Sequence, residues 1–330
     1  MKPKTLVVVG SLLGCAFMAR PASAQFVLLD NFSNDTNGAS LTGDTASDSA
    51  TWVGAGTAGA ITTGTGVSGA YGALLSASSV EGINELPLQT VPTASTPSAI
   101  TTIFFQFDLG GATPLTPAGG AGAITNVNWD LENPGSATTS GGSGGPGSGS
   151  NPSTAFEMNM NINPGGSRGG ITVRNGGNFQ TLSTNDSTAF IPVGNDLYDM
   201  WVVLDQNNAT FSIYMSSPTD TTDFPSSTPV EMWFSGAGAN TTASFPNGGT
   251  PTQTASYRNS NAVADDFVFG NGGGSNDYDE GLYNIYEDAT TGSADLVNPT
   301  VVPEPGAMSL SAIALGGLVL ACRRRRFSVR

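Results

Sequence analysis

Apolar and polar residues alternate in short runs along much of this chain. In Ile100–Leu109, the apolar residues Ile103, Phe105 and Phe107 occupy every second position. In Ala155–Asn163, apolar residues alternate with one glutamate and three asparagines. Because successive side chains of a β-strand point to opposite faces, this period of two predicts strands with one buried face.

Similar runs recur between clusters of Gly, Pro and Asn, and no amphipathic pattern of helical period extends beyond two turns. This organisation favours an all-β fold, a two-sheet β-sandwich or jelly roll. The other single strands that we predict are Phe26–Asp30, Thr51–Val53, Tyr71–Ser76, Ala123–Leu131, Val230–Phe234, Ala264–Phe269 and Leu282–Glu287.

Two pairs of runs are separated by turn residues and predict β-hairpins. They are Ile171–Arg174 with Asn178–Leu182, and Leu197–Leu204 with Thr210–Met215. We place one β-sandwich domain at residues 25–289, with a flexible Gly/Ser-rich loop at 135–152 and a spacer at 290–302.

The first 24 residues have the pattern of a signal peptide. Lys2 and Lys4 precede the apolar stretch Leu6–Met18, and Ala22 and Ala24 form a small-x-small site for signal peptidase. The mature chain is therefore predicted to begin at Gln25 and to be exported.

The C-terminal end combines a short polar motif, an apolar segment and a basic cluster. Pro303, Glu304 and Pro305 precede the 17-residue apolar run Gly306–Cys322, which is followed by four arginines. A run of this length is at the short end of what crosses a bilayer as a helix, and the arginines favour the cytoplasmic side. An ordinary C-terminal anchor would have the same apolar and basic pattern.

The proline-flanked acid is not needed in a simple anchor, and residues 303–326 resemble a PEP-CTERM sorting signal. The resemblance implies processing by an exosortase near Pro303, Glu304 and Pro305, with the membrane contacted through the tail before cleavage. It implies an address at the cell surface, outer membrane or extracellular matrix of a Gram-negative-type bacterium.

Composition then removes several classes of function. The predicted mature region, residues 25–302, holds 25 acidic residues, three arginines and no lysine, a net charge of −22. Such a charge repels nucleic acid. The region has no cysteine and the chain has no histidine, which excludes thiolate and Ser-His chemistry and leaves carboxylates for any acid–base catalysis.

A second resemblance concerns the fold. Asp199–Tyr214 looks like the paired, Trp-containing strands of concanavalin-like (laminin-G-type) jelly rolls, and Ala264–Phe269 and Leu282–Asp288 fit their closing strands. The resemblance implies a jelly roll; a generic β-sandwich or a partial β-solenoid is the alternative.

One strand carries candidate catalytic carboxylates. Asn128, Asp130 and Glu132 share one face of a predicted strand. They are similar to the Glu-x-Asp-x-Glu strand of laminarinase-like glucanases, but Asn128 stands where that family has its nucleophile. The resemblance therefore implies loss of retaining activity, and a divergent carboxylate-dependent glycoside hydrolase or lyase is our alternative function.

Four aspartates are candidate calcium ligands, because Ca²⁺ prefers carboxylate, amide and carbonyl oxygens. Asp30 and Asp35 follow the first predicted strand, and Asp265 and Asp266 lie on a late one. Jelly rolls often pair their first and last strands, which would bring the two pairs together. Acidic turns without metal are the alternative.

Trp129 and Tyr257 have polar neighbours, and we expect both to be exposed and able to stack on sugars. The favoured function is a non-enzymatic exported protein of the biofilm or polysaccharide matrix, with a structural or carbohydrate-binding role. A purely structural surface protein without a ligand remains a third reading.

Overall fold

The computed structural model contains β-strands, turns and loops, and no helix, in the residues that it describes. The predicted signal peptide, the loop at 135–152 and the tail at 303–326 lie outside those residues. Within the described part of the chain, we find no apolar helix of membrane-spanning length. The described residues are 26–56, 61–75, 82–88, 100–110, 127–132, 154–160, 171–176, 178–185, 190, 192–235, 251–260, 264, 266–271, 280–289 and 293–301.

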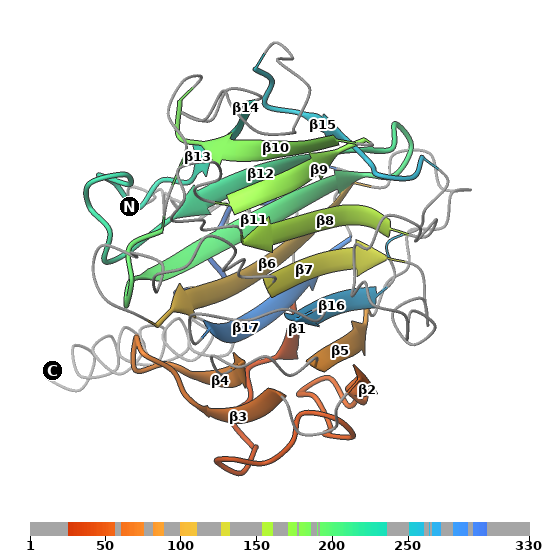
Figure 1. Ribbon diagram of the computed structural model, residues 1–330, viewed down its shortest axis with the longest axis vertical. Coiled ribbons are helices and arrows are strands. Elements are labelled where there is room, and N and C mark those ends of the chain that lie inside the picture. Colours follow the sequence, from red (N-terminus) through yellow and green to blue (C-terminus); the bar gives the residue numbers. More distant parts are fainter. Residues whose placement is uncertain are drawn as a thin grey trace, which may run out of the picture.

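The strands form two antiparallel sheets, which Figure 1 shows one behind the other. The nine-stranded sheet has the order β13 (Val230–Glu231), β12 (Thr210–Ser216), β11 (Leu197–Asp205), β6 (Ile100–Leu109), β17 (Glu280–Asp288), β4 (Tyr71–Leu75) and β3 (Ile61–Thr65), with β1 (Val27–Asp30) on β17 and β15 (Ala255–Ser256) on β12. The eight-stranded sheet has the order β14 (Trp233–Ser235), β10 (Asn178–Ser183), β9 (Ile171–Asn175), β8 (Thr154–Met160), β7 (Val127–Glu132), β16 (Asp266–Asn271), β5 (Gly82–Pro87) and β2 (Val53–Gly56).

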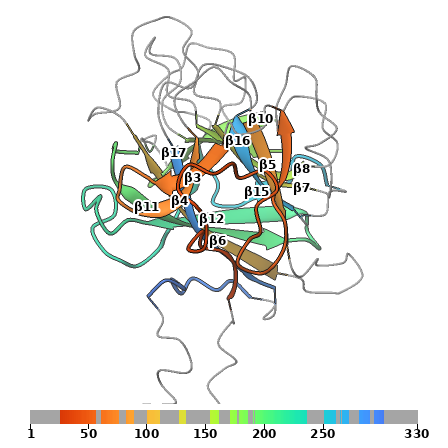
Figure 2. The same ribbon diagram turned by 90° about the horizontal axis from the view of Figure 1, so that it is seen from below.

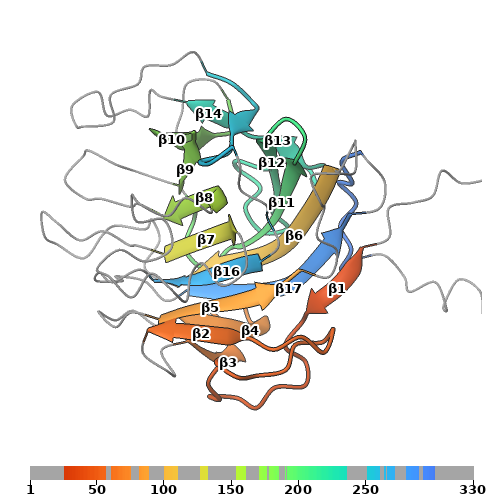
Figure 3. The same cartoon turned by 90° about the vertical axis from the view of Figure 1, so that its right-hand side faces the viewer.

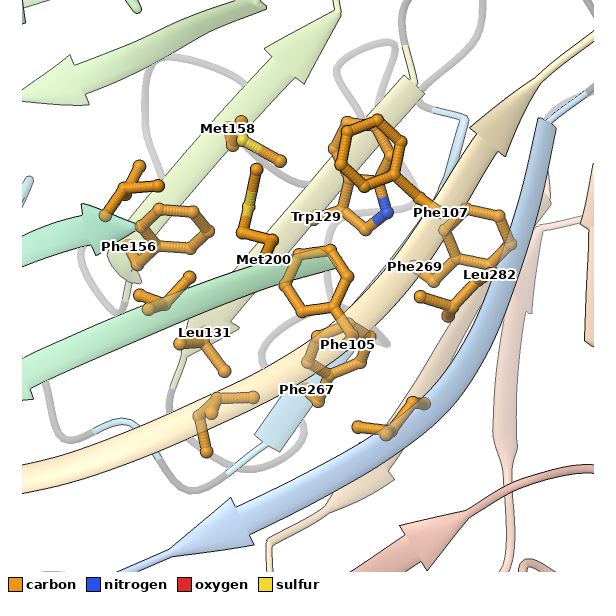
Figure 4. Close-up of a cluster of buried hydrophobic side chains, with 14 of the residues drawn as sticks. Phe105, Phe107, Trp129, Leu131, Phe156, Met158, Met200, Phe267, Phe269 and Leu282 are labelled. Carbon is orange, nitrogen blue, oxygen red and sulfur yellow. The ribbon is translucent and has the colours of Figure 1, made fainter. Parts of the chain in front are cut away.

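The two sheets pack face to face, as the edge-on view in Figure 3 shows. Aromatic side chains from both layers meet in the core (Figure 4). Phe105 on β6 contacts Phe267 on β16 with ring centroids 5.3 Å apart, and Phe107 contacts Trp129 on β7 at 5.2 Å. These contacts join the sheets into one apolar core and confirm the predicted all-β sandwich.

The strand predictions from periodicity are largely confirmed. β6 has the predicted bounds, and both predicted hairpins form, with Asn175 opposite Asn178 and Asp205 opposite Thr210. Three strands were missed: β3, β5 and the two-residue β15. The predicted strand Val230–Phe234 is divided between β13 and β14, which belong to different sheets. β3 and β5 read ITTGT and GINELP and have no apolar residue at every second position.

The outer face of the nine-stranded sheet is covered by the end of the domain. Residues 293–301, which we name the C-terminal strap, cross this face (Figure 2). The indole N–H of Trp201 donates to the Val297 carbonyl at 3.2 Å, and the Asp295 N–H donates to the Thr102 hydroxyl at 3.2 Å. The strap belongs to the folded domain, whereas the sequence placed it in the spacer.

One buried carboxylate ties the strap to three strands. Asp199 on β11 accepts from the Gln106 amide at 2.6 Å, from the Ser216 hydroxyl at 3.3 Å and from the Asn298 amide of the strap at 2.8 Å. Gln106 in turn accepts from the Asn284 amide at 2.6 Å. Burial raises the pKa of Asp199, while these hydrogen bonds lower it. This network supplies hydrogen-bond partners to the polar side chains that the strap covers on the outer face of the nine-stranded sheet.

The core predicts a large difference between two single substitutions. Phe107→Ala removes a fully buried ring between the sheets and is expected to lower the free energy of unfolding by about 3–5 kcal/mol. Val53→Ala, at a side chain that is 44% exposed, is expected to change it by less than about 0.5 kcal/mol. Urea unfolding of both variants measures this; equal losses would contradict the assigned core.

Candidate functional site

Carboxylate residues form a row across the eight-stranded sheet. Val268 on β16 lies opposite Glu85 on β5 and opposite Asp130 on β7. Asp130 in turn lies opposite Glu157 on β8. Residues directly opposite one another in antiparallel strands occupy the same face of the sheet. The register therefore places three acidic residues in one row.

The neighbouring row adds two more acids. Asp266 at the start of β16 lies opposite Glu132 at the end of β7. The residues between these acids along the strands, such as Leu131 and Phe267, belong to the core. The acids therefore occupy the outer face of the sheet. We name this set the carboxylate face: Glu85, Asp130, Glu132, Glu157 and Asp266.

Part of the carboxylate face is closed to solvent. Glu85 and Asp266 are each only 4% exposed, and Ile83 and Val268 form a small buried apolar cluster beside them. Toward the other edge of the sheet, Arg174 on β9 and Thr181 on β10 are partly exposed. Described polar side chains that are partly exposed on this face therefore lie toward β9 and β10.

An arginine continues the row at that side. Met158 on β8 lies opposite Val173 on β9, so the same antiparallel register brings Glu157 next to Arg174. Arg174 is one of three basic residues between positions 25 and 302. Sequence analysis found Asp130 and Glu132 but missed Glu85, Glu157 and Arg174. Nothing in their sequence spacing connects them, because they reach the row from three other strands.

The expected exposure of the two candidate aromatics is wrong. Trp129 is fully buried and Tyr257 is only 3% exposed. Trp129 stacks on Phe105 with centroids 6.3 Å apart, and Tyr257 stacks on Phe211 at 6.4 Å. Trp129 points into the core from β7, and Tyr257 packs into it directly after β15. In this structure they offer no ring face to a sugar.

Asp30, a predicted calcium ligand, organises the segment that follows β1. Its Oδ1 accepts from the backbone N–H of Phe32 at 3.0 Å and from the backbone N–H and hydroxyl of Ser47, and its Oδ2 accepts from the Trp52 indole at 2.7 Å. Burial raises its pKa, and these donors lower it. Asp30 is engaged in fixing the chain between Phe32 and Trp52.

Asp35 lies beside Asp44, which the sequence did not single out. Burial, a hydrogen bond between the two carboxyl groups and the negative charges of Asp44 and Asp30 raise the pKa of Asp35 to about 7. A shared proton between neighbouring carboxyls is the expected outcome when both cannot ionise at low cost. The Asp35 carboxyl therefore keeps its proton to a higher pH than an ordinary aspartate.

The structure does not bring the four predicted calcium ligands together. β1 does pair with the last strand, β17, but Asp266 starts β16 in the other sheet. Asp265 lies outside the described residues. Among the residues that the structure describes, no group of three or more His, Cys, Asp or Glu side chains is arranged to hold a metal ion.

Comparison with known proteins gives similarity of structure only. No family model matches the chain, and no curated protein matches it. Lectin II from Ulex europaeus covers 81% of this chain and 99% of its own, with 13% identity and a TM-score of 0.43. The catalytic domain of a glycoside hydrolase family 131 protein from Coprinopsis cinerea covers 83% and 96%, with 10% identity and a TM-score of 0.43.

Lectin I from Ulex europaeus, solved with the methyl glycoside of α-L-fucose, is similar to the same degree. It covers 80% of this chain and 96% of its own, with 10% identity and a TM-score of 0.42. At these scores the fold is assigned from the strand order and register described above.

The Asp35–Asp44 pair predicts a pH dependence of stability. A carboxyl with a raised pKa binds its proton more tightly in the folded state, so its contribution is complete below its usual pKa of 3.8 and is lost as the pH rises through about 7. The free energy of unfolding is therefore expected to fall from about pH 4 to about pH 7 and to level off above that.

Asp35→Asn removes the titrating group, and Asp44→Asn removes the neighbour that raises its pKa. Both variants are expected to show a flatter profile than the wild type over this pH range. Thermal unfolding at a series of pH values measures it. Two variants with the slope of the wild type would show that the pair does not control this transition.

Proposed function

We propose that this protein is an exported, non-enzymatic β-sandwich that binds extracellular polysaccharide through its carboxylate face. The observation that carries the proposal is the register of five acidic residues from four strands on one face of the eight-stranded sheet. Carboxylate oxygens accept hydrogen bonds from sugar hydroxyls, and bonds to a charged acceptor are stronger than neutral ones.

The position of Arg174 adds a donor to these acceptors. At the end of the row near β9 it is partly exposed, and a guanidinium donates two parallel hydrogen bonds to a carboxylate or to neighbouring oxygens. A face with acceptors in its centre and a fixed donor at its accessible end suits an extended polar ligand such as a glycan chain.

Export and sorting form the second half of the proposal. The signal-peptide pattern of residues 1–24 and the PEP-CTERM-like tail at 303–326 support secretion, with signal peptidase and an exosortase as processing partners. The domain has no cysteine or histidine, and its net charge of −22 favours solubility outside the cell. We place the protein at the cell surface or in the matrix.

Calcium would bridge this face and a glycan, since it takes oxygens from carboxylates and hydroxyls together. The carboxylate face brings five acidic residues to one side of a sheet. Binding is therefore best measured with calcium and with a chelator.

A divergent glycoside hydrolase or lyase is the second candidate, and one observation favours it. Asp130 on β7 and Glu157 on β8 lie directly opposite one another. Glycoside hydrolases use a pair of carboxylic residues that flank the scissile bond. This pair was not visible in the sequence, where only Asp130 and Glu132 were considered.

The binding function predicts that the mature chain is retained on one class of polysaccharide in a glycan array, without new reducing ends. The double variant Asp130→Asn, Glu157→Gln is expected to bind at least about tenfold more weakly, since losing charged acceptors costs about 1.4 kcal/mol or more. Each substitution keeps the shape of the side chain and removes its charge.

Glu231→Gln removes one negative charge from β13 at the edge of the other sheet and is the control for the single substitutions Asp130→Asn and Glu157→Gln. It is expected to bind like the wild type. New reducing ends that disappear in Asp130→Ala or Glu132→Ala would replace the binding function by the enzymatic one. If Glu231→Gln weakens polysaccharide binding equally, the loss of binding is due to the overall charge of the domain and not to the carboxylate face.

A further inference from the structure

Both ends of the folded domain lie on one face. Phe26, the second residue of the predicted mature chain, packs on Phe104 and Tyr286 with ring centroids 6.3 Å from each. Phe104 occupies the outer side of β6, next to Trp201, to which the strap is bound. The start and the end of the domain therefore meet on the outer face of the nine-stranded sheet.

The strap controls where the tail leaves this face. It is held by hydrogen bonds from Trp201 to Val297 and from Asn298 to Asp199, and it ends at Val301, which is 73% exposed. From Val301 to Gly306, where the apolar run begins, five residues span at most about 18 Å. The apolar segment is therefore tethered close to the nine-stranded sheet.

The carboxylate face lies on the opposite side of the sandwich. It is the outer face of the eight-stranded sheet, and Figure 2 shows the strap, in blue, below β6 and on the side away from β5 and β16. Two packed sheets, each with its own outer face, thus separate the tail from the acidic residues.

The carboxylates near the strap are shielded from a lipid surface. Asp108, Asp199, Asp288 and Asp295 are 1%, 5%, 1% and 9% exposed. Asp205 and Glu231, on the same face, are partly exposed. Charges that are buried and hydrogen-bonded repel an anionic lipid surface less than exposed ones.

We propose that the strap orients the domain at the membrane, with the nine-stranded sheet toward the lipid surface and the carboxylate face toward the surrounding matrix. This orientation rests on the proposed function of the tail as a membrane segment before processing. It gives the domain a defined side for glycan contact while the chain is still attached.

Two exposed valines allow a direct test, because the mature domain contains no cysteine. Val297 on the strap is 52% exposed, and Val53 on β2, opposite Glu85 in the carboxylate row, is 44% exposed. The background is the mature chain ending at Arg330 with Cys322→Ser. Val297→Cys or Val53→Cys is introduced into it, one at a time, and each single cysteine is labelled with a fluorophore. Vesicles of phosphatidylethanolamine and phosphatidylglycerol carry a headgroup-attached quencher.

The label at position 297 is expected to be quenched at least about twofold more than the label at position 53, since the sheets between them pack about 10 Å apart. Equal quenching, or stronger quenching at position 53, would overturn the orientation. Asn298→Ala with Trp201→Phe removes two strap hydrogen bonds and is expected to abolish the difference in a chain whose circular dichroism is unchanged. A difference that survives in this variant would show that the strap does not orient the domain.

The two proposals fail separately. A mature chain that does not bind vesicles would overturn the orientation and the membrane role of the tail, while retention on polysaccharide would still stand. Unequal quenching in a chain that binds no polysaccharide would support the orientation and overturn the function of the carboxylate face.

Discussion

Burial of both faces of β6 is the constraint on which the rest of the structure depends. Its inner residues, Phe105 and Phe107, meet the eight-stranded sheet, and this contact joins the two layers. Its outer residues, Phe104 and Gln106, are buried as well, because the strap lies over them. A central strand that is covered on both sides needs a polar network as well as an apolar core.

The domain accommodates its negative charge in three ways. Asp30 and Asp199 are buried and surrounded by hydrogen-bond donors. Asp35 has a raised pKa of about 7, because of burial and then the neighbouring Asp44 carboxyl. Glu280 is buried without a hydrogen-bond partner, and burial and then the charge of Asp108 raise its pKa well above its usual value. In each case the buried carboxyl group is either hydrogen-bonded or more easily protonated. A chain with few basic residues has few cations that could pair with these carboxylates instead.

The organisation of the two sheets separates two tasks. The nine-stranded sheet receives both ends of the domain and the strap, and Asp108, Asp199 and Asp288 on its outer face are buried. The eight-stranded sheet brings acidic residues from β5, β7, β8 and β16 into adjoining rows. The proposed attachment and the proposed ligand contact would therefore lie on opposite sides of one sandwich, with a continuous core between them.

The sequence by itself determined the fold class, both hairpins and the position of β6, because a period of two appears wherever one face of a strand is apolar. It also located Asp130 and Glu132 on one face. Only the tertiary structure decided that Trp129 and Tyr257 are buried, that β3 and β5 are strands, and that Glu85 and Glu157 join the row. Periodicity distinguishes the two faces of a strand, but which element covers a face and which strand lies beside it depend on long-range pairing that one strand's sequence does not contain.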